Sequence, residues 1–257
     1  MVFDKSFLPR LSSSIILIIL AIYANNIGGL FFLSLVFIIT FLLLKEYYEL
    51  FNISLYSISF LINNFFSIII LLFIFNNFFL LIFFPLIIGI LLNIIFYEHK
   101  WNILILPYFY FALPLSLLLY LNNGLEGGKL IIYWLFAIVW ATDTSAFIFG
   151  NIIKGPKLCP KISPNKTLSG FICSLIIASV VSIIFCYLNN SNTIVKALLV
   201  GLITSFFTSV GDLFESWLKR KNNKKDVSKL IPGHGGLLDR LDGFLFAIVG
   251  IYLLNLF

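Results

Sequence analysis

Nine long apolar runs dominate this chain and constrain what it can fold into. They fall at about residues 11–24, 28–44, 57–75, 78–97, 103–121, 130–150, 168–188, 194–214 and 238–256. A helix needs about 20 apolar residues to cross a bilayer core of about 30 Å, and most of the runs approach that length. With 61% hydrophobic and 11% charged residues, a water-soluble fold of 257 residues could not hide this much apolar surface. The sequence therefore predicts an all-α polytopic integral membrane protein.

Helices are expected rather than strands, because the runs lack the alternation of polar and apolar residues that spanning strands show. The first run follows Lys5 and Arg10 and resembles a signal peptide with a weak cleavage site at Ala24. A second apolar run begins at Gly28, and the two together favour an uncleaved helical hairpin. We find no internal repeat and no separate soluble domain in the sequence.

The distribution of Lys and Arg supports nine helices with the N-terminus in the cytoplasm. That topology puts 15 of the 17 cations on the cytoplasmic side and leaves only Lys129 and Lys196 outside. An excess of cations in cytoplasmic loops is the usual pattern in membrane proteins. The two long basic loops, 151–167 and 218–237, are then expected on the same cytoplasmic face.

Acids in or beside the apolar runs are the first candidates for function. Asp143 and Asp212 lie near the cytoplasmic ends of their runs, and Asp239 and Asp242 open the last run. A carboxylate near hydrocarbon is costly unless it is paired, hydrated or bound to metal. Asp212 and Glu215 are three positions apart, as are Asp239 and Asp242, so each pair can share one helix face. The alternative role for these acids is a salt bridge to Lys219, Arg220 or Arg240.

Carboxylates from two helices beneath a rim of cations suit Mg²⁺ and phosphate. Mg²⁺ prefers one or two carboxylates, with water and phosphate oxygens in its other positions. The segment Ser163, Pro164, Asn165, Lys166 and Thr167 directly precedes an apolar run. Free N–H groups at a helix start, together with a hydroxyl and an ammonium, would form an anion site there. An ordinary capped helix start is the alternative.

The stretch from Ser216 to Asp242 concentrates the polar residues of the chain. Its 27 residues hold seven cations, three acids, a histidine and a glycine-rich turn at 233–236. Glycine has no Cβ and tolerates positive φ, so Gly235 and Gly236 let the backbone approach a ligand closely. Three roles stay open for His234, which are to bind phosphate, to act as an acid or to cap the turn.

This stretch resembles the signature of the phosphatidate cytidylyltransferases, also called CDP-diacylglycerol synthases. The signature reads Ser-x-hydrophobic-Lys-Arg, four residues, Lys-Asp-x-small, two residues, hydrophobic-Pro-x-His-Gly-Gly-hydrophobic-x-Asp-Arg-hydrophobic-Asp. Every fixed position is met between Ser216 and Asp242, and a second similar stretch runs from Asp143 to Gly170. The chain departs from the usual Gly, Arg and acid of the family at Ser145, Asn151 and Ser169.

The resemblance implies transfer of the cytidylyl group of CTP to phosphatidate in the inner membrane of a bacterium, with the active site facing the cytoplasm. It implies Asp212 and Asp239 as ligands of Mg²⁺, with Asp143 as a further contributor. A second metal or a monovalent ion stays open. The side chains expected to hold phosphates are Lys166, Lys219, Arg220, Lys225 and Arg240. Asp226 and Asp242 are expected to orient these cations.

The resemblance also assigns parts and partners. Residues 1–130 are expected to form a scaffold in the bilayer, and residues 131–257 the catalytic region with its basic loops. The expected partners are CTP, phosphatidic acid and the lipid bilayer, without nucleic acid, and a homodimer stays open.

The chain has three cysteines, Cys159, Cys173 and Cys186, an odd number without the spacing of a metal site. We therefore expect them to pack as small apolar side chains rather than to form a disulfide or bind a metal.

Two other functions fit parts of the pattern. A CTP-dependent kinase of a polyprenol or phytol would transfer the γ-phosphoryl group to a lipid alcohol and would need a base, such as His234 or an Asp. A transporter also keeps acids inside helices. The contiguous basic loop with its His-Gly-Gly turn argues against the transporter, and the complete signature argues against the kinase.

Overall fold

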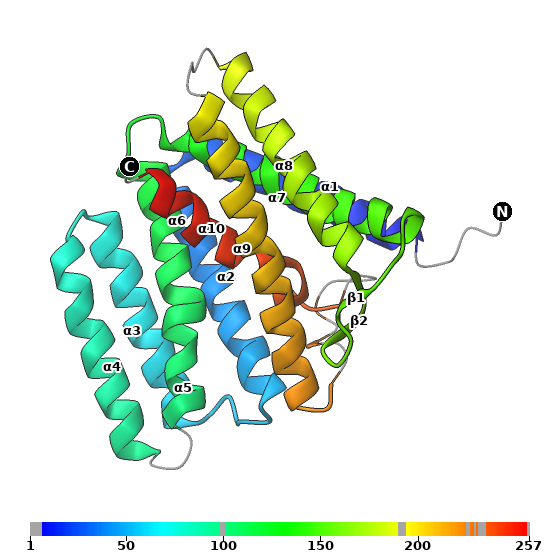
Figure 1. Ribbon diagram of the computed structural model, residues 1–257. Helices are drawn as coiled ribbons and strands as arrows, with labels where there is room; N and C mark the ends of the chain where they lie inside the picture. The colour runs from blue at the N-terminus through cyan, green and yellow to red at the C-terminus, as the bar shows by residue number, and fades with distance from the viewer. Residues whose placement is uncertain are drawn as a thin grey trace. The chain divides into compact units, whose positions relative to one another are not determined.

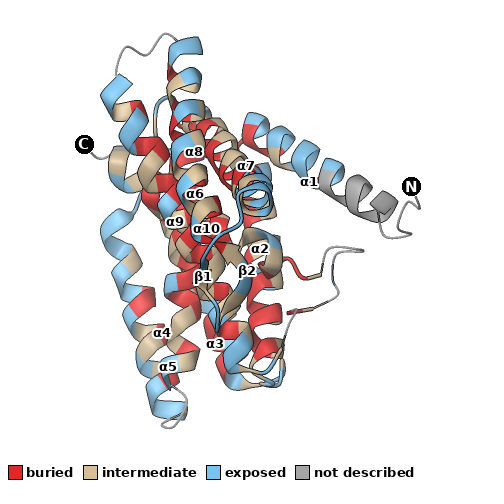
Figure 2. Ribbon diagram, turned by 45° about the vertical axis from the view of Figure 1, so that its right-hand side comes forward, coloured by how far each residue is buried: buried red, intermediate tan, exposed pale blue. Residues whose placement is uncertain are grey.

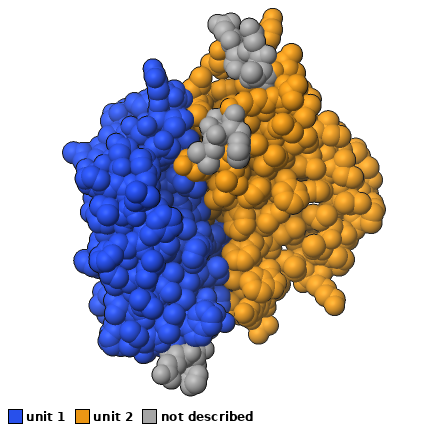
Figure 3. Space-filling model, turned by 60° about the vertical axis from the view of Figure 1, so that its left-hand side comes forward, with its two compact units in different colours: residues 1–129, 224–240 blue, residues 130–223, 241–257 orange. Residues whose placement is uncertain are grey.

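The computed structural model describes residues 7–97, 101–189, 194–224, 227–228, 230 and 235–255, with side chains described from residue 15 to residue 254 of these ranges. The chain divides into two compact units (Figure 3). Unit 1 consists of residues 1–129 and 224–240, and unit 2 of residues 130–223 and 241–257.

The regular segments described in unit 1 are helices (Figure 1). Its segments are α1 (Phe7–Ile27), α2 (Gly29–Leu50), α3 (Ile58–Phe75), the 3₁₀ turn η1 (Phe79–Ile82), α4 (Phe83–Phe96), α5 (Trp101–Pro107), the π turn η2 (Tyr108–Ala112) and α6 (Leu113–Asn123).

Unit 2 holds the longer helices and a small hairpin. Its segments are α7 (Gly128–Ile152), β1 (Lys157–Cys159), β2 (Ser163–Thr167), α8 (Leu168–Leu188), α9 (Ile194–Lys221) and α10 (Leu238–Asn255). The first two residues of α7 and the first three of α10 belong to unit 1.

Among the described residues, seven helices are long and apolar enough to span a membrane. They are Gly29–Leu50, Ile58–Phe75, Phe79–Phe96, Trp101–Asn123, Gly128–Ile152, Leu168–Leu188 and Ile194–Lys221. The protein is an all-α polytopic membrane protein, as the sequence predicts. Helices α1 and α10 match the first and last predicted runs but fall outside this set. The part of α1 with described side chains, Ile15–Ile27, is shorter than a full span, and α10 carries Asp239, Arg240 and Asp242. The nine-helix topology and its orientation therefore stay predictions.

The structure differs from the predicted runs in two places. The run at 103–121 is divided into α5, η2 and α6, because Pro107 lacks an N–H and its ring disfavours a regular helix. The π turn that follows Pro107 absorbs this break. The loop 151–167 contains a short strand pair that the sequence did not predict, in which β1 pairs antiparallel with β2, with Lys157 opposite Thr167 and Cys159 opposite Ser163.

The core of unit 1 combines aromatic rings with buried amides. Tyr47 and Phe111 are fully buried, with ring centroids 5.7 Å apart. Asn63 Nδ2 donates to the Tyr48 hydroxyl at 2.9 Å, and Asn63 Oδ1 accepts from Asn93 Nδ2 at 2.8 Å. Such bonds between helices satisfy polar groups that lipid cannot hydrate, so they help to fix α2, α3 and α4 against one another.

The core of unit 2 relies on small residues where α8 meets α9. A Cβ on Gly201 would lie 2.5 Å from Ser179 Cα, so only glycine permits this approach. Trp134 Nε1 on α7 donates to Ser182 Oγ at 3.0 Å, and this ties α7 to the same contact. Close packing of small residues is the usual way in which helices associate in lipid, where hydrophobicity gives no driving force.

The opposite face of α8 is an apolar stripe. Six exposed residues recur every four positions, at Leu168, Ile172, Ile176, Val180, Ile184 and Leu188. Exposed positions of α8 are pale blue in Figure 2. Side chains four apart lie on one face of a helix. An exposed face made only of such residues suits acyl chains rather than water, in agreement with the membrane assignment.

Candidate active site

A half-exposed ion pair joins the hairpin to α9 in unit 2. Lys166 lies on β2, and its Nζ donates to Asp212 Oδ2 at 2.7 Å. The two side chains are 33% and 26% exposed, so one side of the pair is open. The sequence predicts a phosphate contact for Lys166 and a metal contact for Asp212. The structure brings these two residues into direct contact.

A second ion pair lies one turn further along α9 and is far more buried. Lys219 Nζ lies 2.6 Å from Glu215 Oε2, with exposed fractions of 14% for the lysine and 1% for the glutamate. A buried carboxylate needs a close cation, because removal from water is costly. The salt bridge that the sequence left open for Glu215 is therefore present. Lys219, predicted to hold phosphate, neutralises this acid in the structure.

Helices α9 and α10 cross closely beside Asp212. A Cβ on Gly211 would lie 2.5 Å from the carbonyl oxygen of Asp242, and a Cβ on Gly243 would lie 2.5 Å from Asp212 Oδ1. Sequence reasoning missed both glycines as parts of the site. The available signal was the glycine next to an intramembrane aspartate in each helix, since glycine at such a place permits close backbone approach.

The crossing gathers charges of both signs. Asp242 lies within electrostatic range of Asp212, Glu215 and Lys166. Together with Lys219, the cluster contains three carboxyl groups and two ammonium groups. The cluster therefore has one more acid than it has lysines, and its carboxyl oxygens are hard donors of the kind that Mg²⁺ prefers.

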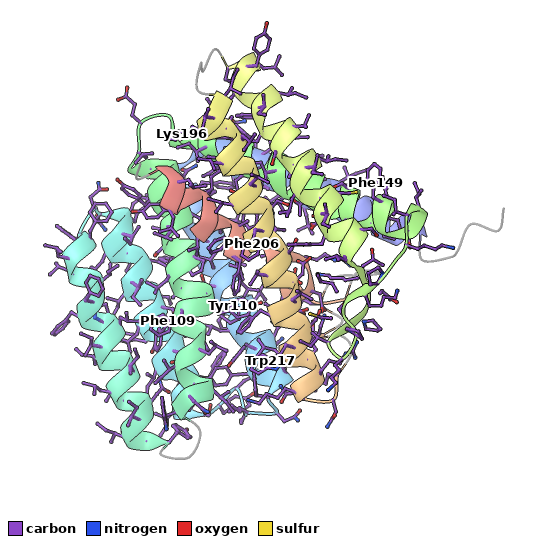
Figure 4. The ribbon with its side chains drawn as sticks, viewed as in Figure 1. Phe109, Tyr110, Phe149, Lys196, Phe206 and Trp217 are labelled. Carbon is purple, nitrogen blue, oxygen red and sulfur yellow. The ribbon has the colours of Figure 1, made fainter. Side chains whose placement is uncertain are left out.

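The last turn of α9 adds further cations. It contains Lys219, Arg220 and Lys221, which lie at the opposite end of α9 from Lys196 (Figure 4 labels Lys196 and Trp217). Lys221 Nζ lies 5.2 Å from the centre of the Trp217 ring, which favours a cation–π contact. Arg220 is exposed, and its Nε donates to the Ile162 carbonyl at the long distance of 3.4 Å. Its guanidinium therefore lies beside the hairpin.

The segment Ser163–Thr167 is a strand and a helix cap. Thr167 Oγ1 accepts from Gly170 N at 3.2 Å, and Leu168 N donates to the Pro156 carbonyl at 2.9 Å. These two N–H groups are therefore used within the protein rather than left for an anion. The capped helix start, left open as the alternative, is what the structure has. Ser163 and Lys166 are half-buried, and Asn165 is exposed.

In unit 1, Asp239 holds the backbone of the loop that precedes it. Its Oδ2 accepts from Gly236 N at 2.8 Å and from Val227 N at 3.3 Å. Gly235 has φ +87°, and a Cβ on it would lie 3.0 Å from the same oxygen. The two described glycines of the turn thus let the backbone approach a carboxylate of the protein itself. Asp239 lies in the first turn of α10 and is half-buried.

Glu46 is the residue of this region that sequence reasoning missed as functional. It lies on α2, is 1% exposed, and accepts from Leu237 N, Leu238 N and Ser228 Oγ. The family resemblance includes the region of Glu46 and Glu49, but it gives neither residue a role, and the position of Glu46 next to Lys45 more often marks a salt bridge at the membrane surface.

The remaining predicted residues that the structure describes lie at exposed positions or in different units. Arg240 is exposed at the start of α10, and Asp143 is exposed on α7. Asp239 belongs to unit 1, whereas Asp212 and Asp143 belong to unit 2. Among the residues whose placement is described, no group of three or more His, Cys, Asp or Glu is arranged to hold a metal ion. Three predicted site residues lie outside the described residues, namely Lys225, Asp226 and His234.

Comparison with known proteins identifies relatives of the chain. The phosphatidate cytidylyltransferase of Staphylococcus haemolyticus is 46% identical over 122 residues, which is 47% of each chain. The protein of the same name from Staphylococcus aureus is 47% identical over 124 residues, 48% of this chain and 47% of the relative. The chain thus matches just under half of the length of these staphylococcal relatives. The phosphatidate cytidylyltransferase of Rickettsia prowazekii is 37% identical over 164 residues, 61% of this chain and 71% of the relative.

A family model extends the similarity beyond these alignments. It is described as the cytidylyltransferase family, and it matches residues 9–257. The matched range includes both ion pairs of unit 2, the loop held by Asp239, and Glu46. With nearly its whole length matched, this chain belongs to the cytidylyltransferase family.

Proposed function

We propose that this protein transfers the cytidylyl group of CTP to phosphatidate, giving CDP-diacylglycerol and pyrophosphate. The observation that carries the proposal is the half-exposed contact between Lys166 and Asp212. The family resemblance assigns these two residues to phosphate and metal. Membership of the cytidylyltransferase family and the printed name of the relatives support the same activity.

The proposed reaction is a displacement at phosphorus. A phosphate oxygen of phosphatidate attacks the α-phosphorus of CTP and forms a new P–O bond. The bond from the α-phosphorus to the oxygen that bridges to the β-phosphorus breaks, and pyrophosphate leaves with that electron pair. The attacking oxygen already carries negative charge near neutral pH, so no base has to remove a proton. The work left for the protein is to position two anions and to compensate their charge.

Lys166 is suited to this work because its present partner holds it weakly. An ion pair that is partly exposed contributes only about 0–1 kcal/mol, since water competes for both charges. An incoming phosphate can therefore draw the Lys166 ammonium away from Asp212 at little cost. The same movement would uncover an oxygen of Asp212. Lys219 is less available, because its ammonium lies against the buried Glu215.

We propose that Mg²⁺ assists the reaction, held by Asp212 and Asp239 with Asp143 as a further contributor. The excess of carboxyl over ammonium groups around Asp212 and Asp242 fits a hard cation, because Mg²⁺ favours carboxylate oxygens. Bound Mg²⁺ supplies charge neutralisation on the phosphates and on the leaving pyrophosphate. The cations expected to orient the phosphates are Lys166, Arg220, Lys225 and Arg240.

The proposed location is the inner membrane of a bacterial cell, with the site open to the cytoplasm. The three cations in the last turn of α9 support this orientation, because cationic residues concentrate on the cytoplasmic side. Both the lipid substrate and the lipid product stay in the bilayer. Their headgroups would reach the site at the membrane surface, and their acyl chains would enter sideways between helices.

Label transfer from CTP tests this function. Purified protein is incubated with phosphatidate, Mg²⁺ and CTP that carries label on either the α-phosphate or the γ-phosphate. We expect label in the lipid only from the α-position. Label from the γ-position, with a lipid alcohol as acceptor, would identify a kinase instead. No transfer to any lipid would overturn the proposal and return attention to transport.

A further inference from the structure

We propose that Glu46 is a positioning residue of the active site, acting through the loop between α9 and α10. The described residues of this loop, 222–224, 227, 228, 230 and 235–237, are called the signature loop here. The inference rests on the proposed function for its kinetic consequence, but its geometric part stands on unit 1 alone. It extends the active site to α2, a helix in the part of the chain that was expected to serve only as scaffold.

The carboxyl group of Glu46 holds the signature loop on both sides. Its Oε1 accepts from Ser228 Oγ at 2.5 Å, on the side of the loop that follows α9. The same oxygen accepts from Leu237 N at 2.9 Å, and Oε2 accepts from Leu238 N at 2.7 Å, at the start of α10. Two segments of the loop that are about ten residues apart in sequence are therefore fixed to one side chain of α2.

Glu46 does for α10 what a local cap does for other helices. The first N–H groups of a helix have no partner within it, and a side-chain oxygen of Ser, Thr, Asp or Asn usually accepts from them. Leu237 precedes α10 and has no such oxygen. The acceptor comes instead from a residue 191 positions earlier in the chain. A carboxylate at this end of a helix also interacts favourably with the helix dipole.

Asp239 depends on the arrangement that Glu46 maintains. Its Oδ2 accepts from Val227 N and Gly236 N, which are neighbours of the groups bonded to Glu46. A Cβ on Gly236 would lie 2.9 Å from Glu46 Oε2 and 3.0 Å from Asp239 Oδ2. The two carboxylates therefore share one backbone turn. Loss of Glu46 would free this turn, and with it the direction of Asp239.

Glu49 shows why this role belongs to Glu46 and is not a general property of acids on α2. Glu49 lies one turn later on the same helix, and its side chain is 41% exposed. Its carboxylate lies 3.9 Å from Lys45, whereas its backbone carbonyl accepts from Lys224. The bonds to the start of α10 are made by Glu46.

The test compares Glu46→Gln with Glu49→Gln in the full chain in lipid nanodiscs. An amide side chain has the size of the carboxylate, but its NH₂ group would face backbone N–H donors. In Glu46→Gln we expect faster hydrogen exchange of the amides of Leu237 and Leu238. We also expect a fall in kcat on the order of 10- to 100-fold, the usual effect of losing a group that orients a metal ligand, with a smaller change in KM for CTP. Glu49→Gln should match the wild type in both measurements.

Two further variants keep the inference testable if Glu46→Gln is poorly folded. Ser228→Ala removes one of the three donors and should lower kcat less than Glu46→Gln does. Glu46→Asp keeps the charge and should recover part of the kcat that Glu46→Gln loses. Wild-type kcat and wild-type exchange in Glu46→Gln would overturn the inference. Loss of thermal stability with unchanged kcat would also overturn it, since Glu46 would then be structural only.

Failure of the proposed function gives a different result. If the wild type transfers no cytidylyl label, the proposed activity is wrong, whereas the hydrogen-exchange comparison still tests whether Glu46 holds the start of α10. Unchanged exchange in Glu46→Gln, in protein that transfers label normally, would remove the inference and leave the activity intact.

Discussion

The two ion pairs of α9 differ in burial, and this difference separates a functional role from a structural one. Lys166 and Asp212 are about a third and a quarter exposed, so they can exchange partners with a ligand. Glu215 and Lys219 are nearly buried, so each is held by the other. Asp212 and Glu215 are both acids and lie three positions apart on α9, but they are therefore expected to respond differently to substitution.

Asp212→Asn should abolish transfer while the protein still inserts and folds. The substitution removes the charge that holds Lys166 and that is proposed to bind Mg²⁺, but a half-exposed pair adds only about 0–1 kcal/mol to stability. The measurements are label transfer from α-labelled CTP and the thermal midpoint in detergent. Asp239→Asn should also lose activity, but with faster exchange of the Gly236 amide, because Asp239 Oδ2 accepts from that group. Normal turnover by either variant would remove it from the metal assignment.

Glu215→Gln should lower stability strongly. The change leaves the Lys219 ammonium largely buried without its counter-charge, and breaking a buried pair on one side costs about 3–5 kcal/mol. The residual exposure of Lys219 puts the expected cost at the lower end. The double variant Glu215→Leu, Lys219→Met should recover much of the thermal midpoint. A control is Glu49→Gln, whose partner Lys45 is exposed and 3.9 Å away. Equal midpoints for Glu215→Gln and this control would contradict the expectation.

At the scale of elements, the crossing of α9 and α10 is the contact that shapes the carboxylate cluster. Gly211 and Gly243 face each other there, because a Cβ on Gly211 would lie 2.9 Å from Gly243 Cα. The helices can therefore bring Asp212 and Asp242 close only while both positions stay without side chains.

Gly243→Ala should lower activity more than it lowers stability. The new methyl would lie 2.5 Å from Asp212 Oδ1 and 2.9 Å from Thr208 Cγ2, so the carboxylate must turn away or the helices must separate. The matched control is Gly250→Ala, two turns later on α10, where the methyl meets the Phe207 ring at 3.1 Å. We expect kcat to fall at least tenfold further in Gly243→Ala than in Gly250→Ala, measured by α-label transfer. Similar kcat values would show that the crossing does not govern Asp212.

The sequence predicted the helices well because each spanning helix has its own local signal. Hydropathy alone located the segments from α2 to α9, although α2 ends at Leu50 rather than 44 and α9 at Lys221 rather than 214. It could not locate the strand pair β1–β2, whose polar residues carry no alternation. It also missed the π turn after Pro107, because the residues of this turn are as apolar as the helices on either side of it.

The candidate site was predicted only in part, since its contacts join distant segments. Intramembrane depth marked Asp212, and the family resemblance marked Lys166, but neither signal predicts that the two touch. Glu46 escaped because its three donors lie more than 180 positions away. Its role depends on backbone N–H groups, which every residue except proline has and which therefore leave no trace in a sequence.

At the scale of the whole molecule, the topology is the main open prediction. Nine crossings place the residues after Phe257 outside the cytoplasm, with the hairpin loop 151–167 inside. A reporter fused after Phe257 should therefore give a periplasmic signal, and single cysteines placed in the hairpin loop should be protected from reagents that cannot cross the membrane. A cytoplasmic signal would show that α1 or α10, the two helices outside the set of seven, does not cross.

The bonds between Glu46 and the start of α10 also impose an order on biogenesis. The ribosome makes α2 early, but the groups that satisfy Glu46 emerge about 190 residues later, a delay of about 10–40 s at usual rates of synthesis. During that interval Glu46 lacks the three donors that bind it in the finished structure. Arrival of the last helix then satisfies it, so completion of the chain acts as a checkpoint. Nascent chains that stall before α10 would keep an unsatisfied acid, a feature by which a membrane protease could distinguish them from finished protein.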